Sequence, residues 1–242
     1  MPAVAGDLGP DAVTDPLDYP FDVPRVGYLW RAGEVAPGAA DGDDAALDGR
    51  TPVLAIGSNA APAQLSRKFS ADRFRRHGTA DAVIPVTAAV APEVDVVYAA
   101  HVARYGSVPA TLAVSPGARA HVFVTWLTPA QLERMNDSEA LGRHYDLVSV
   151  GGVRSGGRSL DGTVSYVSVA GVARFDGRPL ALSAVRTEGR TVGAASQLDV
   201  WRRLAADLAV AGGGEALVAR VVADPGERAR VIAHLRAGRP AP

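Results

Sequence analysis

The sequence lacks cysteine, an excess of basic residues and any long hydrophobic run. The absence of cysteine among its 242 residues excludes disulfides, thiolate nucleophiles, cysteine-based zinc sites and iron–sulfur clusters. Lysine and arginine number 25 against 26 acidic residues, so a general nucleic-acid surface is not expected. No apolar run approaches the roughly 18 to 20 residues that cross a bilayer, and the acidic segment 1–20 does not resemble a signal peptide. We therefore expect a cytoplasmic protein with no nucleic-acid partner and no membrane partner.

The composition is that of a globular chain, with 48% hydrophobic residues and enough length for one sizeable domain with appendages. Residues 1–50 are rich in Pro, Gly, Ala and Asp and are expected to form an irregular N-terminal arm. Within it, the aromatic stretch Tyr19–Trp30 should pack as an extended arm and residues 33–48 should form a flexible acidic loop. Residues 51–190 carry strand patterns and residues 191–242 carry helix patterns. Either the arm or the C-terminal helices could form a homodimer contact.

The strand patterns are short, closely spaced and separated by Pro and Gly, which favours an antiparallel sheet or a small barrel over βαβ units. A buried strand at Val53–Ile56 comes first, and residues 151–162 read as a mobile connection. Further strands are expected at Ala82–Val90, Val94–Ala103, Ala110–Ser115, His121–Leu127, Tyr145–Val150, Thr163–Val169 and Leu180–Val185.

Helices are predicted from caps as well as from periodicity. Thr128, Pro129 and Gln131 form a capping-box start for a helix that should run to about Asn136. Ser196 has the same role before an amphipathic helix. The other helices are expected at Ala61–Phe69, Glu215–Val222 and from Asp224 to about Gly238.

Two separate segments could carry chemistry. Gly57-Ser58-Asn59 lies between a strand and a helix, where backbone N–H groups, small side chains and a helix N-terminus could cradle a carboxylate or an oxyanion. The same tripeptide is also ordinary turn chemistry. Glu139 follows a well-capped helix, where a lone Glu is usually solvated, and its neighbour Asp137 suits a C-cap or turn.

The histidines show no metal-ligand spacing. His101, His121 and His144 lie in or beside strands and are interpreted as satisfied or surface residues. His144 is the hardest to dismiss, because it lies between Glu139 and the next strand.

Lys68 is the only lysine among 25 basic residues, which we interpret as a compositional habit. A basic cluster in the following loop is expected to be a solvated face. Nucleic-acid binding through this region is a weaker alternative, because aromatic residues are sparse there. The cluster is Arg73, Arg75, Arg76 and His77, and the alternative would add Arg67 and Lys68.

The order of these motifs resembles that of the γ-glutamylcyclotransferase-like family, which includes the γ-glutamylamine cyclotransferases. The resemblance covers roughly residues 52–150. The first hallmark is Tyr-Gly-Ser-Asn at the end of the first strand, and this sequence has Ile56 in place of the tyrosine. The motifs that carry it are Gly57-Ser58-Asn59, Val108–Leu112, Ser115-Pro116-Gly117, Val122–Leu127 and Glu139 before Tyr145.

The resemblance implies an α+β fold, a small and mostly antiparallel β-barrel with external helices, here with extra C-terminal helices. It implies that Gly57, Ser58 and Asn59 line a cavity with Tyr145 and bind a γ-glutamyl-like substrate. Glu139 would be the general base and acid. It would take a proton from the substrate α-amine as that nitrogen attacks the γ-carbonyl. The products would be 5-oxoproline and an amine or amino acid, and neither a metal nor an organic cofactor would be required.

A non-catalytic ligand-binding or protein-interaction module that retains the barrel is the alternative. It predicts that Glu139 is exposed or tied to a structural partner. It also predicts that no pocket of roughly 300 Å³ or more lies beside Gly57.

Overall fold

The computed structural model describes residues 15–40, 47–69 and 83–238. The predicted cluster at residues 73–77 lies outside these ranges. The fold is α+β and is built on a mixed, 12-stranded sheet with a separate two-stranded hairpin. In the large sheet the pairing order is β14-β12-β4-β5-β3-β9-β6. The strands are β1 Tyr28–Arg31, β2 Glu34–Pro37, β3 Thr51–Ala55, β4 Val83–Tyr98, β5 Ala110–Leu127, β6 Tyr145–Ser149, β7 Arg154–Ser155, β8 Arg158–Ser159, β9 Val164–Ser168, β10 Arg174–Phe175, β11 Arg178–Pro179, β12 Ala181–Leu182, β13 Thr187–Glu188 and β14 Ala194–Ala195.

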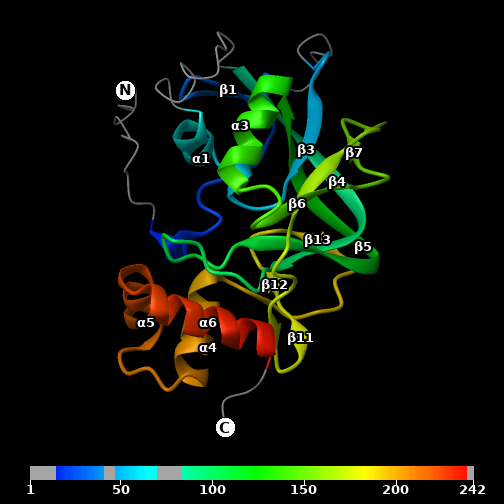
Figure 1. Ribbon diagram of the computed structural model, residues 1–242. Coiled ribbons are helices and arrows are strands. Elements are labelled where there is room, and N and C mark those ends of the chain that lie inside the picture. Colours follow the sequence, from blue (N-terminus) through cyan, green and yellow to red (C-terminus); the bar gives the residue numbers. More distant parts are fainter. Residues whose placement is uncertain (1–14, 41–46, 70–82, 239–242) are drawn as a thin grey trace, which may run out of the picture.

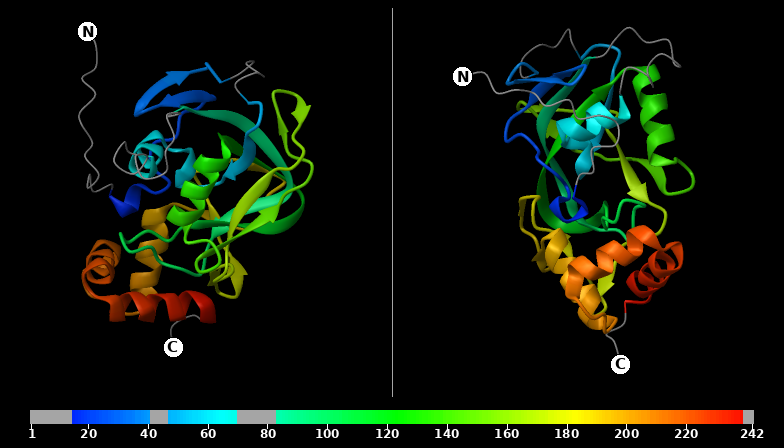
Figure 2. Two further views of the ribbon diagram at one scale, coloured as in Figure 1. Left: turned by 45° about the horizontal axis from the view of Figure 1, so that its top comes forward. Right: turned by 90° about the vertical axis from the view of Figure 1, so that its left-hand side faces the viewer.

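The helices form two groups on either side of the sheet. In Figure 1 α1 and α3 lie at the upper end and α4, α5 and α6 pack together at the lower end, and both views of Figure 2 show the same separation. None of the described helices has the length and hydrophobicity to cross a membrane. The helices are η1 Pro16–Asp18, η3 Ser58–Ala60, α1 Pro62–Lys68, α3 Pro129–Glu139, α4 Gln197–Asp207, α5 Gly213–Ala223 and α6 Pro225–Ala237.

Two long strands, β4 and β5, form the centre of the sheet, and here the prediction of four short strands was wrong. β4 has 16 residues and β5 has 18. The expected turn at Pro92 is a bulge within β4, with Glu93 at φ 61°. The expected turn at Pro116-Gly117 lies inside β5, with Gly117 at φ 77°. Pro and positive-φ residues at a bulge bend a strand without reversing it, so these residues curl the sheet.

The sheet is not the closed barrel that we expected. Closure would need its two end strands, β14 and β6, to pair, and no such ladder exists in the described part of the chain. Strand β14 has two residues and runs directly into α4, so it offers too few backbone groups to close the sheet. The parallel pairs β3–β9 and β12–β14 make the sheet mixed.

The N-terminal segment is more regular than predicted. Tyr28 and Trp30 lie in β1, which pairs with β4 and with β2, so part of the expected loop at 33–48 is a strand. Both rings are buried, at 0% and 1% exposure. The Tyr28 hydroxyl donates to the Ala60 carbonyl at 2.6 Å. The pairing and burial of these aromatic residues hold the segment in the sheet.

The predicted caps are present. Thr128 and Gln131 form a capping box at α3, and Ser196 and Asp199 form one at α4. Helix α3 is longer than expected, because it ends at Ala140 in the left-handed conformation rather than near Asn136. The expected mobile connection at 151–162 contains the β7–β8 hairpin.

The C-terminal helices share the larger hydrophobic core with the sheet. Trp201 and Leu204 of α4 are completely buried in the cluster that also contains Tyr98 and Val124. The Tyr98 hydroxyl donates to the Ala195 carbonyl at 3.0 Å. The described residues 191–238 are therefore packed as part of the main body, and the three-part division of the chain stays a prediction.

Candidate active site

A cavity of about 620 Å³ lies between the sheet and the two helix groups. Gly57, Ser58, Asn59, Glu139 and Tyr145 all line it. The structure therefore brings together the five residues that the sequence predicted, although Asn59 and Glu139 are 80 positions apart. The roles of the five in binding and catalysis stay predictions.

The Gly57 loop lies against a buried tyrosine from the N-terminal segment. A Cβ at Gly57 would overlap the Tyr19 hydroxyl and approach the Ala110 methyl group at 3.3 Å. That hydroxyl accepts a hydrogen bond from the Ala110 N–H at 2.8 Å. Only glycine permits this approach, so the loop residue and the tyrosine depend on each other.

Helix α1 follows the loop at Pro62–Lys68, close to the predicted Ala61–Phe69. The single 3-10 turn Ser58–Ala60 separates Gly57 from α1, which starts at Pro62. Within the described chain, the N–H groups of Gly57, Ser58 and Asn59 have no protein acceptor. Free N–H groups at the wall of a cavity are available to a substrate carbonyl or carboxylate.

Glu139 is the last residue of α3 and turns into the cavity. Its Oε1 atom accepts a hydrogen bond from Asn59 Nδ2 at 3.0 Å. The same oxygen is ion-paired with the Lys68 Nζ atom. The side chains of Lys68 and Glu139 are only 7% and 12% exposed. Within the described residues the Oε2 atom has no hydrogen-bond donor, so this oxygen is available to a ligand.

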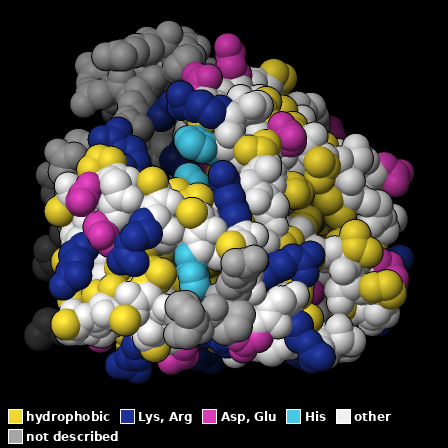
Figure 3. All heavy atoms as spheres, turned by 60° about the horizontal axis from the view of Figure 1, so that its bottom comes forward, with side chains coloured by type: hydrophobic (Ala, Val, Ile, Leu, Met, Phe, Trp, Pro, Cys, Tyr) yellow, Lys and Arg dark blue, Asp and Glu magenta, His cyan; other side chains and the backbone are white. Residues whose placement is uncertain are grey.

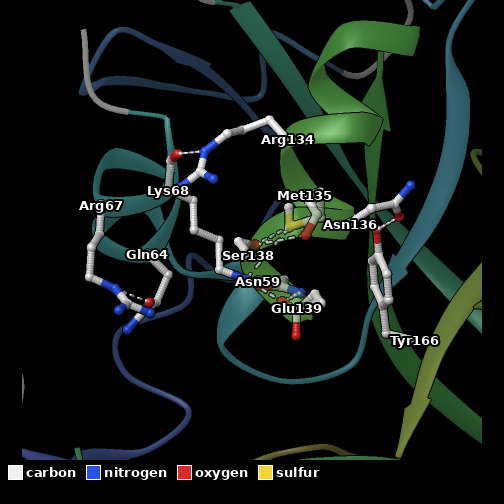
Figure 4. Close-up of polar contacts among 10 residues, drawn as sticks. All are labelled: Asn59, Gln64, Arg67, Lys68, Arg134, Met135, Asn136, Ser138, Glu139 and Tyr166. Atoms are coloured by element: carbon white, nitrogen blue, oxygen red, sulfur yellow. Dashed lines mark hydrogen bonds and ion pairs between the residues drawn. The ribbon is translucent and has the colours of Figure 1, made fainter. Parts of the chain in front are cut away.

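Lys68 is the residue that sequence reasoning missed. Figure 4 shows it reaching from the end of α1 to the end of α3, where its Nζ also donates to Asn59 Oδ1 at 2.6 Å. Arg134 Nε donates to the Lys68 carbonyl at 2.9 Å and ties the two helices together. Burial lowers the pKa of the Lys68 ammonium, and Glu139 opposes that shift.

A signal for Lys68 was present in the composition. Arginine is used at every other basic position, and arginine stays protonated in proteins. A lysine ammonium in a buried site can lose its proton, whereas an arginine guanidinium does not. The single lysine therefore occupies a buried position, where lysine and arginine differ most in their ability to lose a proton. The compositional interpretation of Lys68 was therefore incomplete.

Tyrosines form the wall around Glu139. Burial, followed by the charge of Glu139, raises the pKa of Tyr145 well above its ordinary value, and burial also raises the pKa of Tyr19, Tyr105 and Tyr166. These phenols therefore stay neutral and act as hydrogen-bonding groups. The Tyr166 hydroxyl donates to Asn136 Oδ1 at 2.6 Å. Directly before the loop, this sequence has Ile56 where the hallmark Tyr-Gly-Ser-Asn has a tyrosine. Tyr19 supplies an aromatic ring beside the same loop.

The other end of the cavity is lined by residues that the sequence did not bring into the site. His101 and His144 lie with their ring centroids 4.9 Å apart. Arg228 and Ile232 of α6 lie on the same wall, so the C-terminal helices contribute to the cavity. His121 is separate, because it pairs with Glu188 on the surface at 2.9 Å. Among the described residues no three His, Asp or Glu side chains are grouped as metal ligands.

Each of the two hypotheses from the sequence is supported by one feature of the cavity: its size agrees with an enzyme, and the pairing of Glu139 agrees with a binding module. The cavity exceeds the size that the binding-module hypothesis allowed. The ion pair with Lys68 is nevertheless the kind of structural partner that the same hypothesis assigned to Glu139.

No protein-family profile matches the chain, and no curated protein matches it. Among solved structures, YkqA from Bacillus subtilis is 13% identical, with a TM-score of 0.40 over 62% of this chain and 60% of that chain. An uncharacterized Homo sapiens protein is 16% identical, with a TM-score of 0.34 over 50% of this chain and 68% of that one. An Arabidopsis thaliana protein solved in solution is 15% identical, with a TM-score of 0.33 over 54% and 73%. The likeness thus spans less than two thirds of the length of YkqA.

Proposed function

We propose that the protein is a γ-glutamylcyclotransferase-like enzyme that releases 5-oxoproline from a γ-glutamyl compound. The observation that supports this most is the position of Glu139, which lines the same cavity as the Gly57-Ser58-Asn59 loop and accepts a hydrogen bond from Asn59. A base opposite a set of amide donors is the arrangement that intramolecular attack of an amine on a carbonyl requires.

The proposed reaction starts with the substrate α-ammonium group beside Glu139 Oε2. This oxygen takes one proton, and the neutral nitrogen attacks the γ-carbonyl carbon while the Gly57 and Ser58 N–H groups stabilise the developing oxyanion. The carbon–nitrogen bond to the leaving amine then breaks as Glu139 returns this proton to the leaving nitrogen. The attacking nitrogen gives up its second proton through Glu139 to the released amine, so the products are 5-oxoproline and a protonated amine. Because both reacting groups belong to one molecule, a cavity that holds it folded removes much of the entropic barrier.

Lys68 and Asn59 position the base. Both donate to Oε1, which fixes the carboxylate plane and turns Oε2 towards the open part of the cavity. Burial lowers the pKa of Lys68, and the charge and hydrogen bond of Glu139 oppose that shift. Asn59 therefore has a positioning role in this scheme in addition to contact with substrate.

A binding module is the second candidate, and the Lys68–Glu139 ion pair favours it. A carboxylate held by a buried cation can serve structure alone. In that case a γ-glutamyl compound would bind in the cavity and leave unchanged.

The test is 5-oxoproline release from a panel of γ-glutamyl amino acids and γ-glutamyl amines. Glu139→Gln should reduce the rate by about 10²- to 10⁴-fold, the range for loss of a general base. Glu133→Gln is the matched control, because Glu133 is an exposed residue of the same helix and should not change the rate.

Thermal unfolding of both variants separates a lost base from a lost fold. Equal rates in the folded Glu139→Gln variant and the wild type would exclude Glu139 as the base. Binding of γ-glutamyl compounds without release of 5-oxoproline would support the binding module.

A further inference from the structure

One end of the cavity is rich in positive charge. Three segments that are distant in sequence meet there: the β4–β5 connection, the loop after α3, and α6. Counted over the whole cavity lining, the cationic side chains outnumber the carboxylates, which are Asp137 and Glu139. The cationic side chains are Arg67, Lys68, Arg104, Arg143 and Arg228, and the histidines are His101 and His144.

Most of these cations have no carboxylate partner in the described part of the chain. Lys68 is paired with Glu139, but no Asp or Glu in the described ranges lies within ion-pair distance of Arg104, Arg143 or Arg228. One Arg228 nitrogen, Nη1, donates to the Val221 carbonyl at 3.1 Å. This bond holds the side chain at the wall and leaves its other N–H groups available to a ligand.

The histidine pair reports the same local field. Burial, followed by the nearby His144, Arg236 and Arg228, lowers the pKa of His101 to about 4. These three neighbours all disfavour a proton on His101. Figure 3 shows histidine side chains in a recess bordered by Lys and Arg side chains.

We propose that this end of the cavity is an anion subsite that binds a carboxylate or phosphate group on the leaving portion of the substrate. Arg228 is its principal ligand, and Arg143 and the His101–His144 pair complete it. The inference rests on the proposed function, because the γ-glutamyl end occupies the Glu139 end and the leaving amine extends towards α6. The preferred substrates are therefore γ-glutamyl conjugates of an acidic amine.

This subsite also gives the C-terminal helices a role in recognition. The core residues Trp201 and Leu204 hold α4 against the sheet. Helix α6 contributes side chains to the same hydrophobic core cluster as α4. A helix set that is fixed in this way places Arg228 without a further ordering cost when the ligand binds.

The test measures anion binding without turnover. Isothermal titration calorimetry with inorganic phosphate and, separately, with succinate should show binding to the wild type in a low-salt buffer. Arg228→Gln should weaken it by roughly tenfold or more, because a charge-assisted hydrogen bond is lost. Arg230→Gln is the matched control: Arg230 lies on the same helix, is bonded to Glu227 at 2.9 Å and does not line the cavity, so the affinity should change less than about twofold.

The two probes distinguish a phosphate from a carboxylate ligand. Equal weakening of anion binding by Arg228→Gln and Arg230→Gln would show a net-charge effect and overturn the proposal. The proposal would also be overturned if neither phosphate nor succinate binds to the wild type. The result does not depend on catalysis, because Glu139→Gln should still bind the anion even if no γ-glutamyl compound is turned over. If there is turnover, the wild type should prefer γ-glutamyl-glycine over γ-glutamyl-methylamine, whose leaving amine carries no carboxylate, through KM, and Arg228→Gln should remove that preference.

Discussion

The Lys68–Glu139 pair predicts a strong energetic coupling that can be measured directly. Lys68→Met keeps the length of the side chain and removes the ammonium, beside a methionine that Lys68 already contacts, Met135, at 3.5 Å. The substitution leaves the Glu139 carboxylate, whose side chain is 12% exposed, with Asn59 as its remaining donor among the described residues.

The expected magnitude follows from burial. Removing one partner of a buried ion pair costs about 3–5 kcal/mol. The cavity gives Glu139 some access to water and Asn59 still donates to it, so we expect about 2–3 kcal/mol for Lys68→Met. Glu139→Gln should cost less, because the Gln oxygen can accept from Lys68 and the ammonium can lose its proton. The double variant should then be more stable than the sum of the two effects predicts, by about 2 kcal/mol.

Urea denaturation of the wild type, the two single variants and the double variant at pH 7 gives this coupling energy. A matched cycle on Arg202 and Glu215, an exposed pair at 3.9 Å, should give less than about 1 kcal/mol. If the Lys68–Glu139 cycle is additive within about 0.5 kcal/mol, the two groups do not form the pair on which the site geometry depends.

Two other perturbations test the walls of the cavity. Gly57→Ala should destabilise the fold by about 1–3 kcal/mol, because the added methyl group overlaps the Tyr19 hydroxyl. In a thermal-unfolding cycle, Tyr19→Phe should reduce that penalty. A penalty that Tyr19→Phe leaves unchanged would mean that the two residues are not in contact. His101 has a folded-state pKa of about 4 against an ordinary value of 6.5, so between these values the unfolded chain binds more protons and stability should fall as the pH falls from 6.5 towards 4. The loss should be on the order of 1–2 kcal/mol because His101 is partly exposed, and His101→Gln should flatten this part of the pH profile; an unchanged profile would contradict the assignment.

Local features of the fold were predictable from the sequence. The capping boxes at Thr128 and Ser196 are short-range hydrogen-bond patterns, and both are present. Features that depend on how a strand bends were not predictable in the same way. Pro92 and Gly117 read as turns, because a bulge and a turn use the same residue types. Barrel closure depends on which strands meet at the edges, and periodicity carries no information about that.

The candidate site shows the same contrast between features that are visible in the sequence and features that depend on tertiary packing. The motif order brought Gly57, Asn59 and Glu139 to attention, and the structure brings them together. Tyr19 and Arg228 come from segments outside the region of resemblance, so only the tertiary packing could reveal them. Lys68 is an intermediate case, because its rarity was visible in the sequence while its partners were not.

The proposed reaction depends most on the Glu139 carboxylate, and the rate of 5-oxoproline formation per folded chain measures the contribution of this group. On the best γ-glutamyl compound, we expect Glu139→Gln to retain at most about a hundredth of the wild-type rate, while Glu133→Gln retains all of it. A Glu139→Gln protein that is folded and releases 5-oxoproline at the wild-type rate would contradict the central claim.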